Sequence, residues 1–124
     1  MNDRTENVAV VGASPKDERY SNMAMRMLAE YGRNPIPVAP ARKEVIGKTA
    51  YPSLADVPEK IDTVTVYIRA SRQSQMIADI IQIKPRRVIF NPGAENPDEY
   101  ARLRNLGIEV LEACTLVMLH TGQF

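Results

Sequence analysis

The residues best suited to chemistry lie in the segment 7–20, NVAVVGASPKDERY, where a short apolar run is followed by a glycine turn. Gly12 has no Cβ, so a ligand can approach its backbone closely. Ser14 can donate a hydrogen bond, and Lys16 and Arg19 can supply positive charge. A strand, a tight turn and a helix would place these groups at the positive end of a helix dipole, which attracts anions. The segment predicts a phosphate-binding turn, with a plain strand-to-helix connection as the alternative.

The turn lacks the full dinucleotide fingerprint. Of the pattern G-x-G-x-x-G it contains only the first glycine, Gly12, so it indicates NAD weakly. NAD sites also place an acid about 20 residues further on, to bind a ribose hydroxyl. Here the expected second strand is followed by Arg42 and Lys43. Basic side chains suit a phosphate on the adenosine ribose, as in coenzyme A (3′-phosphate) or NADP (2′-phosphate); two solvated loop charges are the alternative.

Three other side chains were weighed for chemistry. Cys114 could be a redox thiol or form a mixed disulfide with coenzyme A, but a lone cysteine at a strand-to-helix turn is more often small packing. His120 lies at the end of the last expected helix, which favours a surface or capping role. Glu112, at a strand end, could act as a base or bind an amide of the ligand. No nucleophile–base pair and no metal-ligand cluster can be argued, so no catalytic residue is predicted.

Composition limits the class of protein. The chain has 124 residues, 44% of them apolar, which is enough for one domain spanning 1–124. A net charge of +1, and arginines without a regular stripe, argue against nucleic acid as a partner. No apolar run is long enough to span a membrane, and the polar start MNDRTEN does not resemble a signal peptide. We therefore expect a cytoplasmic protein without disulfides.

Strand-like apolar runs alternate with helical patterns. Strands are expected at 7–12, 35–39, 62–68, 87–90 and 108–111. Helices are expected from about 21 to Gly32, at 71–83 with Ser71 as cap, from an Asn96 cap to Gly107, and at 114–120. The segment 40–54 is expected to be irregular, with a helical turn near 53–57. Arg86 and Arg87 are expected to form a solvated patch at the amino end of the fourth strand.

This alternation predicts an α/β protein of βαβ units. The expected fold is a Rossmann-like, doubly wound, parallel five-stranded sheet in the order 3-2-1-4-5, within three α/β/α layers. Right-handed crossovers bring the carboxyl ends of all the strands to one edge. Ligands bind at that edge, and we expect the site between the ends of strands one and four.

Five segments together resemble a known family. They are VAVVGASPKDERYS (8–21), IPVAPARKEVIGKTAYPSLADVP (36–58), IDTVTVYIRA (61–70), FNPGAEN (90–96) and GIEVLEACTLVML (107–119). The chain resembles small stand-alone CoA-binding domain proteins, and it is similar to the CoA-binding domain of the succinyl-CoA synthetase α subunit.

The resemblance implies a set of contacts to coenzyme A. By this resemblance the pyrophosphate would meet Gly12, Ala13 and Ser14, with Arg19 nearby. The adenosine and its 3′-phosphate would be bordered by Pro40, Arg42 and Lys43. The nucleotide would run along Tyr67, Ile68 and Arg69, and the pantetheine path would be flanked by Asn91, Pro92 and Gly93.

Two functions follow as hypotheses. The first is a non-catalytic module that binds coenzyme A or an acyl-CoA and acts as carrier, sensor or partner, with a homodimer or a partner subunit possible. The second is a small NADP-dependent or acyl-CoA-using enzyme that needs a partner chain. The single histidine and single cysteine favour the first hypothesis.

Overall fold

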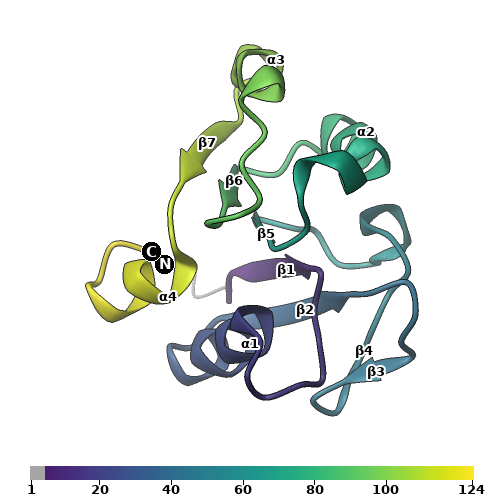
Figure 1. The fold of residues 1–124 in the computed structure, drawn as a ribbon, viewed down its shortest axis with the longest axis vertical. Helices are drawn as coiled ribbons and strands as arrows, with labels where there is room; N and C mark the ends of the chain where they lie inside the picture. Colours follow the sequence, from purple (N-terminus) through teal and green to yellow (C-terminus); the bar gives the residue numbers. More distant parts are fainter. Residues whose placement is uncertain (1–4) are drawn as a thin grey trace.

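The computed structural model describes residues 5–124, which fold into a central parallel sheet with helices on both faces (Figure 1). The sheet strands are β1 Asn7–Val11, β2 Asn34–Val38, β5 Thr63–Val66, β6 Arg87–Phe90 and β7 Glu109–Glu112. The helices are α1 Tyr20–Glu30, α2 Ser74–Ile83, α3 Tyr100–Asn105 and α4 Thr115–His120. Short 3₁₀ turns are η1 Leu54–Asp56, η2 Ala70–Arg72 and η3 Pro97–Glu99, and a hairpin is formed by β3 Glu44–Val45 and β4 Lys48–Thr49.

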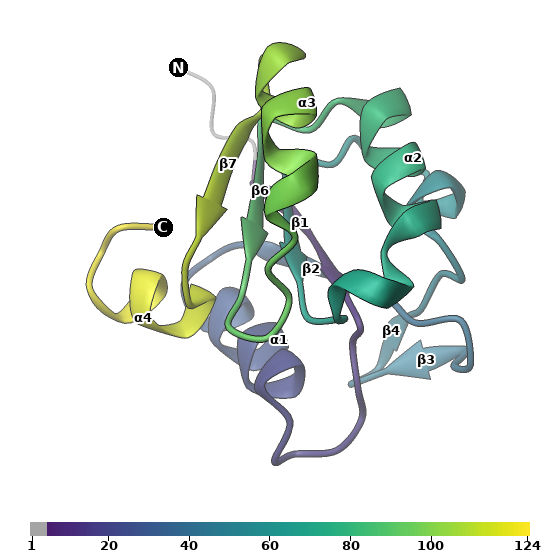
Figure 2. The same ribbon diagram turned by 45° about the horizontal axis from the view of Figure 1, so that its top comes forward.

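Alternation along β1 builds the two halves of the core. Val8 and Val10 point to one face, where they pack with α1 and α4. Ala9 and Val11 point to the other face, into a larger cluster with α2 and α3. Figure 2 shows these two helical layers on opposite sides of the sheet. Because β1 is buried on both faces, it reads as a continuous apolar run in the sequence. The predicted Rossmann-like, doubly wound α/β/α fold is thereby confirmed.

The strand order differs from the prediction. Counted along the chain, the five sheet strands lie in the order 2-1-3-4-5, not 3-2-1-4-5. The outer edge of β2 explains the difference. The Val38 carbonyl faces β1, whereas the Pro37 carbonyl faces outward and accepts from Tyr51 N–H at 3.1 Å. Pro35 shares that outward direction, and neither proline has an N–H to offer another strand. The third strand therefore pairs with β1 instead.

This order moves the expected crevice. In the order 2-1-3-4-5 the direction of winding reverses between β1 and β5, and ligands bind at such a switch point. The crevice therefore lies between the ends of β1 and β5. The expectation of a site between the ends of strands one and four was wrong on this point, because strand four (β6) lies beyond β5.

The segment expected to be irregular contains the β3–β4 hairpin. Its two-residue turn consists of Ile46 and Gly47, with φ of 51° and 72°. Both residues have positive φ, which matches the tight turns that join paired strands. Tyr51 then forms a parallel bridge to Val38. The helical turn expected near 53–57 is present as η1.

The helix cap predicted at Ser71 was wrong, whereas the cap predicted at Asn96 is confirmed in position, before η3 and α3. Helix α2 begins after Gln73 rather than Ser71, because residues 70–72 form the turn η2. Gln73 is fully buried, and its Nε2 donates to the carbonyls of Ile68 at 2.8 Å and Ala94 at 2.7 Å. Asn96 makes no side-chain bond to its own helix; its Nδ2 donates to Gln73 Oε1 at 3.0 Å. Both amides tie loops together at the carboxyl edge of the sheet.

Arg87 was expected in solvent and is instead only 5% exposed. Its Nε donates to Thr63 Oγ1 at 2.9 Å, its Nη2 lies 3.2 Å from Glu6 Oε2, and its guanidinium stacks on the Phe124 ring at 4.1 Å. Burial lowers the pKa of Arg87, and the Glu6 carboxylate opposes that shift. The expectation holds for Arg86, whose side chain is exposed and bonds Glu6 at 3.0 Å. Because Arg87 has an ion-pair partner and a ring to cover it, the sheet tolerates its burial.

Across residues 5–124, none of the helices combines the length and the apolar character that crossing a membrane requires.

Candidate functional site

Two hollows meet at Gly12, one on each face of the sheet. The first, here called the α2-side pocket, has a volume of about 290 Å³. Its lining residues are Val11, Gly12, Val38, Pro40, Pro52, Ser53, Leu54, Ile68, Arg72, Gln75, Met76 and Asp79. The second, the α1-side pocket, has a volume of about 230 Å³ and is lined by Gly12, Ser14, Arg19, Tyr20, Ser21, Tyr67 and Pro92. A single ligand that crosses Gly12 could occupy both.

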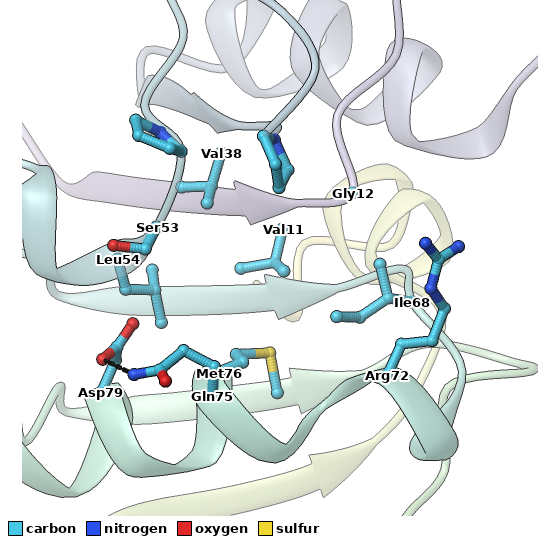
Figure 3. Close-up of a pocket in the computed structure, with 12 residues that line it drawn as sticks. Val11, Gly12, Val38, Ser53, Leu54, Ile68, Arg72, Gln75, Met76 and Asp79 are labelled. Carbon is cyan, nitrogen blue, oxygen red and sulfur yellow. Dashed lines mark hydrogen bonds between the residues drawn. The ribbon is translucent and has the colours of Figure 1, made fainter.

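The α2-side pocket has aliphatic walls and charged ends. Figure 3 shows Met76 in its middle, with Arg72 at one end near Ile68, and Asp79 at the other end beside Leu54. Arg72 and Asp79 lie two turns apart along the same helical stretch, which is about 10 Å of helix. The pocket can therefore hold a flat apolar group while a cation and an anion face its two ends.

The α1-side pocket is more polar and adjoins the start of a helix. Arg19 is the residue before α1, and it makes no side-chain hydrogen bond to the helix. The positive end of the α1 dipole therefore faces this pocket. Ser14 Oγ accepts from the Lys16 N–H at 3.1 Å, so the Ser14 hydroxyl keeps its own proton to donate. The helix dipole and the Ser14 hydroxyl together make this pocket suitable for a phosphate.

Gly12 occupies a position that no other residue fits well. Its φ is +90°, and a Cβ at this position would lie 2.9 Å from Ile68 Cγ2 and 3.4 Å from the Tyr67 carbonyl carbon. Its N–H donates to the Val38 carbonyl at 3.0 Å, and the Ala13 N–H reaches the same oxygen at 3.4 Å. The turn thus presents bare backbone to a ligand, while its first two N–H groups are already bonded within the protein.

The remaining predicted site residues fall into three positions. Pro40 and Ile68 line the α2-side pocket. Arg42 and Lys43 are exposed on the segment that leads from β2 to the hairpin, and they are not among the residues lining either pocket. Arg69 is exposed just before η2, at the same edge of the sheet.

The Asn91 side chain points into the protein and does not face either pocket. Its side chain is buried, and Nδ2 donates to Thr65 Oγ1 at 2.7 Å and to the Val66 carbonyl at 3.0 Å. Its Oδ1 accepts the Thr115 N–H at 2.8 Å. The pantetheine contact implied for Asn91 therefore has no free amide atom to make it. The neighbouring Pro92 does line the α1-side pocket, and Gly93 is exposed beside it.

Tyr67 forms the inner wall of the α1-side pocket. Burial raises the pKa of Tyr67 to about 12. Thr65 and Thr115 bond each other at 2.8 Å and lie near enough to oppose that shift, but neither completes a hydrogen bond to the phenol. Cys114, half-buried before α4, also influences the phenol electrostatically. The Tyr67 hydroxyl is thus a buried group with no partner among the described residues.

The other groups weighed for chemistry are occupied or peripheral. Glu112 accepts a hydrogen bond from the Tyr100 hydroxyl at 2.7 Å, and burial together with this carboxylate raises the pKa of Tyr100 to about 12. His120 is exposed in the last turn of α4. Over the described range 5–124, the structure brings together no group of histidine, cysteine and acidic side chains that could hold a metal ion.

Four polar residues of the α2-side pocket were not predicted from the sequence: Ser53, Arg72, Gln75 and Asp79. A signal for three of them was present. Arg72, Gln75 and Asp79 are spaced by three and four residues, which places them on one helix face. Met76, Ile77 and Ile80 form an apolar stripe in the same segment, and this stripe is the stronger signal there.

Comparison with known sequences decides the family. A model of the CoA binding domain matches residues 6–120. The chain belongs to this family. The CoA-binding domain described here is similar to the uncharacterized protein YneT of Bacillus subtilis (strain 168), with 26% identity over 94% of this chain and 87% of that protein. It also matches the ADP-forming acetate–CoA ligase I of Archaeoglobus fulgidus, with 33% identity over 51% of this chain but only 9% of the ligase.

Solved structures agree with this placement. An uncharacterized protein of known crystal structure has 40% identity, a TM-score of 0.89, and a match covering 98% of this chain and 100% of that one. The domain is therefore related to a CoA-binding part of a larger ligase and also to small proteins of its own length. The NADP alternative finds no support in these comparisons.

Proposed function

We propose that this protein, as one domain over residues 1–124, binds coenzyme A or an acyl-CoA as a non-catalytic carrier, sensor or partner module. The observation that carries the proposal is the pair of unlike pockets that meet at Gly12, at the switch point of the sheet. Coenzyme A has a flat base, a pyrophosphate and a long pantetheine arm. Family membership supports this choice of ligand.

The adenosine belongs in the α2-side pocket. Val38, Leu54 and Met76 provide apolar surface of the kind that buries a purine ring, and Pro40 closes the end near β2. The opposite pocket is a poorer place for the base, because Ser14 and the start of α1 make it polar.

The pyrophosphate belongs at the Gly12 turn. The missing Cβ of Gly12 lets the phosphates pass close to the backbone, and the Ser14 hydroxyl can donate to them. Arg19, exposed at the start of α1, adds positive charge. From there the pantetheine arm would follow the α1-side pocket past Pro92 and Gly93, toward Tyr67.

The 3′-phosphate is assigned to Arg42 and Lys43. These residues follow β2, the strand that supports the ribose in open α/β sheets, and the structure gives neither side chain another partner among the described residues. Binding a phosphate would form charge-assisted hydrogen bonds, which are about twice as strong as neutral ones.

Non-catalytic binding is preferred over catalysis because of the surroundings of Cys114 and Glu112. Cys114 has no histidine beside it in the described hydrogen bonds, and Glu112 is already bonded to Tyr100. The acetate–CoA ligase relative is matched over only 9% of its own length, so the likeness covers a small part of that enzyme.

Calorimetric titration with coenzyme A and with 3′-dephospho-coenzyme A tests the proposal. The wild-type protein should bind coenzyme A about ten- to a hundredfold more tightly, as expected for hydrogen bonds to a charged group. Replacing both Arg42 and Lys43 by Ala should remove most of that preference. Lys60→Ala, an exposed lysine before β5, should retain it. Equal wild-type affinities would contradict the role of this basic pair, and tighter binding of NADP would contradict the choice of ligand.

A further inference from the structure

Asp79 is a buried acid that the phosphate and pantetheine contacts leave unexplained. It lies in the middle of α2, is 6% exposed, and faces the α2-side pocket (Figure 3). Its Oδ1 accepts a hydrogen bond from Gln75 Nε2 at 2.9 Å. Its Oδ2 is buried without a hydrogen-bond partner among the described residues.

Such an oxygen needs a donor. A buried polar atom without a hydrogen bond is costly, and a carboxylate oxygen is costlier than a neutral one. In Figure 3 Leu54 lies beside Asp79, and Met76 lies between Asp79 and the cation at the other end, Arg72. The Ser53 hydroxyl, at the Asp79 end, donates to Asp56 at 2.9 Å. None of the residues from 5 to 124 donates to Oδ2, whereas an occupant of the pocket could.

The arrangement of the pocket indicates which part of the occupant would donate to Asp79. Gly12 and Arg72 lie at one end in Figure 3, and Asp79 lies at the other. In the proposed function the phosphates are at the Gly12 end, so the base points toward Asp79. Adenine carries an exocyclic 6-amino group, which is a hydrogen-bond donor. A 6-oxopurine would place an acceptor oxygen against the carboxylate.

We infer that Asp79 determines specificity for adenine, by accepting a hydrogen bond from the 6-amino group at Oδ2 while Gln75 holds Oδ1. This inference rests on the proposed function, because it takes the base to lie in the α2-side pocket. A site built to bond a ligand N–H rejects the analogue that lacks it, since the buried acceptor would then stay unpaired. Asp79 thus distinguishes a 6-amino group from the 6-oxo group of hypoxanthine at the far end of the pocket.

The test compares coenzyme A with the analogue in which hypoxanthine replaces adenine. Wild-type protein should bind coenzyme A at least about tenfold more tightly, as expected for one hydrogen bond to a charged acceptor. Asp79→Asn keeps the shape of the side chain but can donate to a 6-oxo group, so its preference should fall to near unity or reverse. Asp98→Asn, at an exposed acid in η3, is the matched control and should keep the wild-type preference.

The results distinguish a failure of the Asp79 role from a failure of coenzyme A binding. Equal wild-type affinity for the two ligands would overturn the role of Asp79 and leave coenzyme A binding intact, and this comparison requires no variant to fold. An unchanged preference in a folded Asp79→Asn protein would overturn the role as well. If wild-type protein bound neither ligand, the proposed function would fail and this inference with it.

Discussion

At the scale of single residues, the site combines a residue without a side chain and two buried polar atoms without hydrogen-bond partners among the described residues. Gly12 offers backbone without a side chain, and the hydroxyl of Tyr67 and Oδ2 of Asp79 are buried without hydrogen-bond partners. Most buried polar atoms in proteins are paired, so such exceptions need an explanation. Here both unpaired side chains line the two pockets that meet at Gly12.

Tyr67→Phe tests the state of the buried phenol. The folded-state pKa of Tyr67 is about 12, above its ordinary value of 10. The folded protein therefore holds this proton more tightly, so the stabilisation it gives is complete below pH 10 and is lost as the pH rises toward 12. The free energy of unfolding of wild type should fall relative to Tyr67→Phe over that interval. At pH 7 the variant should be within about 1 kcal/mol of wild type, because no hydrogen bond is removed.

Urea unfolding at a series of pH values measures both quantities. Tyr20→Phe is the control, since Tyr20 is 69% exposed and its variant should follow wild type at every pH. A difference between wild type and Tyr67→Phe that stayed constant from pH 10 to 12 would show that the phenol is not buried as described.

The motif and the resemblance together pointed to residues that line the pockets around Gly12. Gly12, Ser14, Pro40 and Ile68 were predicted from the motif and the resemblance, and all four line a pocket. The resemblance implied that Asn91 flanks the pantetheine path, but its side chain bonds Thr65, the Val66 carbonyl and the Thr115 N–H within the protein. An asparagine after a strand can contact a ligand or bond neighbouring strands. The sequence looks the same in both cases, because the two roles differ only in the direction of the side-chain amide.

At the scale of elements, a buried amide network joins the strand ends that form the site. Asn91, after β6, bonds β5 through Thr65 and the Val66 carbonyl, and it bonds α4 through the Thr115 N–H. Gln73 does the same between the end of β5 and the loop before α3. These bonds fix where the carboxyl ends of the strands lie relative to one another.

Asn91→Ala should therefore destabilise the whole domain. It would leave the Thr115 N–H buried without this partner, and such a group costs about 1–3 kcal/mol. It would also remove the side-chain bonds to Thr65 and to the Val66 carbonyl, although that carbonyl keeps the backbone N–H of residue 91 at 3.3 Å. We expect the free energy of unfolding in urea to fall by about 2–4 kcal/mol. Asn105→Ala, at an exposed position, should change it by less than about 0.5 kcal/mol. A loss for Asn91→Ala as small as that of the control would mean that water replaces the network without cost.

Strands were easier to predict from the sequence than the elements between them. The strand at 87–90 was predicted to the residue, because its apolar run is bounded by Pro85 and Pro92. The hairpin at 44–49 was missed, because its strands are only two residues long and Ile46 is an unusual residue for a positive φ. Gln73 was missed as a helix start, because its signal is burial and not a residue type typical of caps.

At the scale of the whole molecule, the fold class followed from the alternation of elements, but the strand order did not. The deciding feature was the proline pair in β2, Pro35 and Pro37, whose missing N–H groups make one edge of that strand unsuitable for pairing. That information was in the sequence. It required knowing which way each residue of β2 faces, and this depends on the register with β1.

The order of strands matters for function because it fixes the crevice. With β5 beside β1, the tip of β5 brings Ile68 against Gly12, and the two pockets open on either side of that contact. We propose that coenzyme A passes from one pocket to the other at this contact between Ile68 and Gly12. This path predicts that a side chain at position 12 would obstruct the ligand where the same change at another glycine would not.

Titration of coenzyme A into wild type, Gly12→Ala and Gly107→Ala tests this claim most directly. Both glycines have a positive φ, +90° and +83°, so both variants carry backbone strain, but a Cβ at Gly107 meets nothing within 4 Å. We predict that wild type and folded Gly107→Ala bind coenzyme A alike, and that folded Gly12→Ala binds it at least about tenfold more weakly, a loss of about 1.4 kcal/mol. Wild type that does not bind coenzyme A, or Gly12→Ala that binds it as tightly as wild type, would contradict the account.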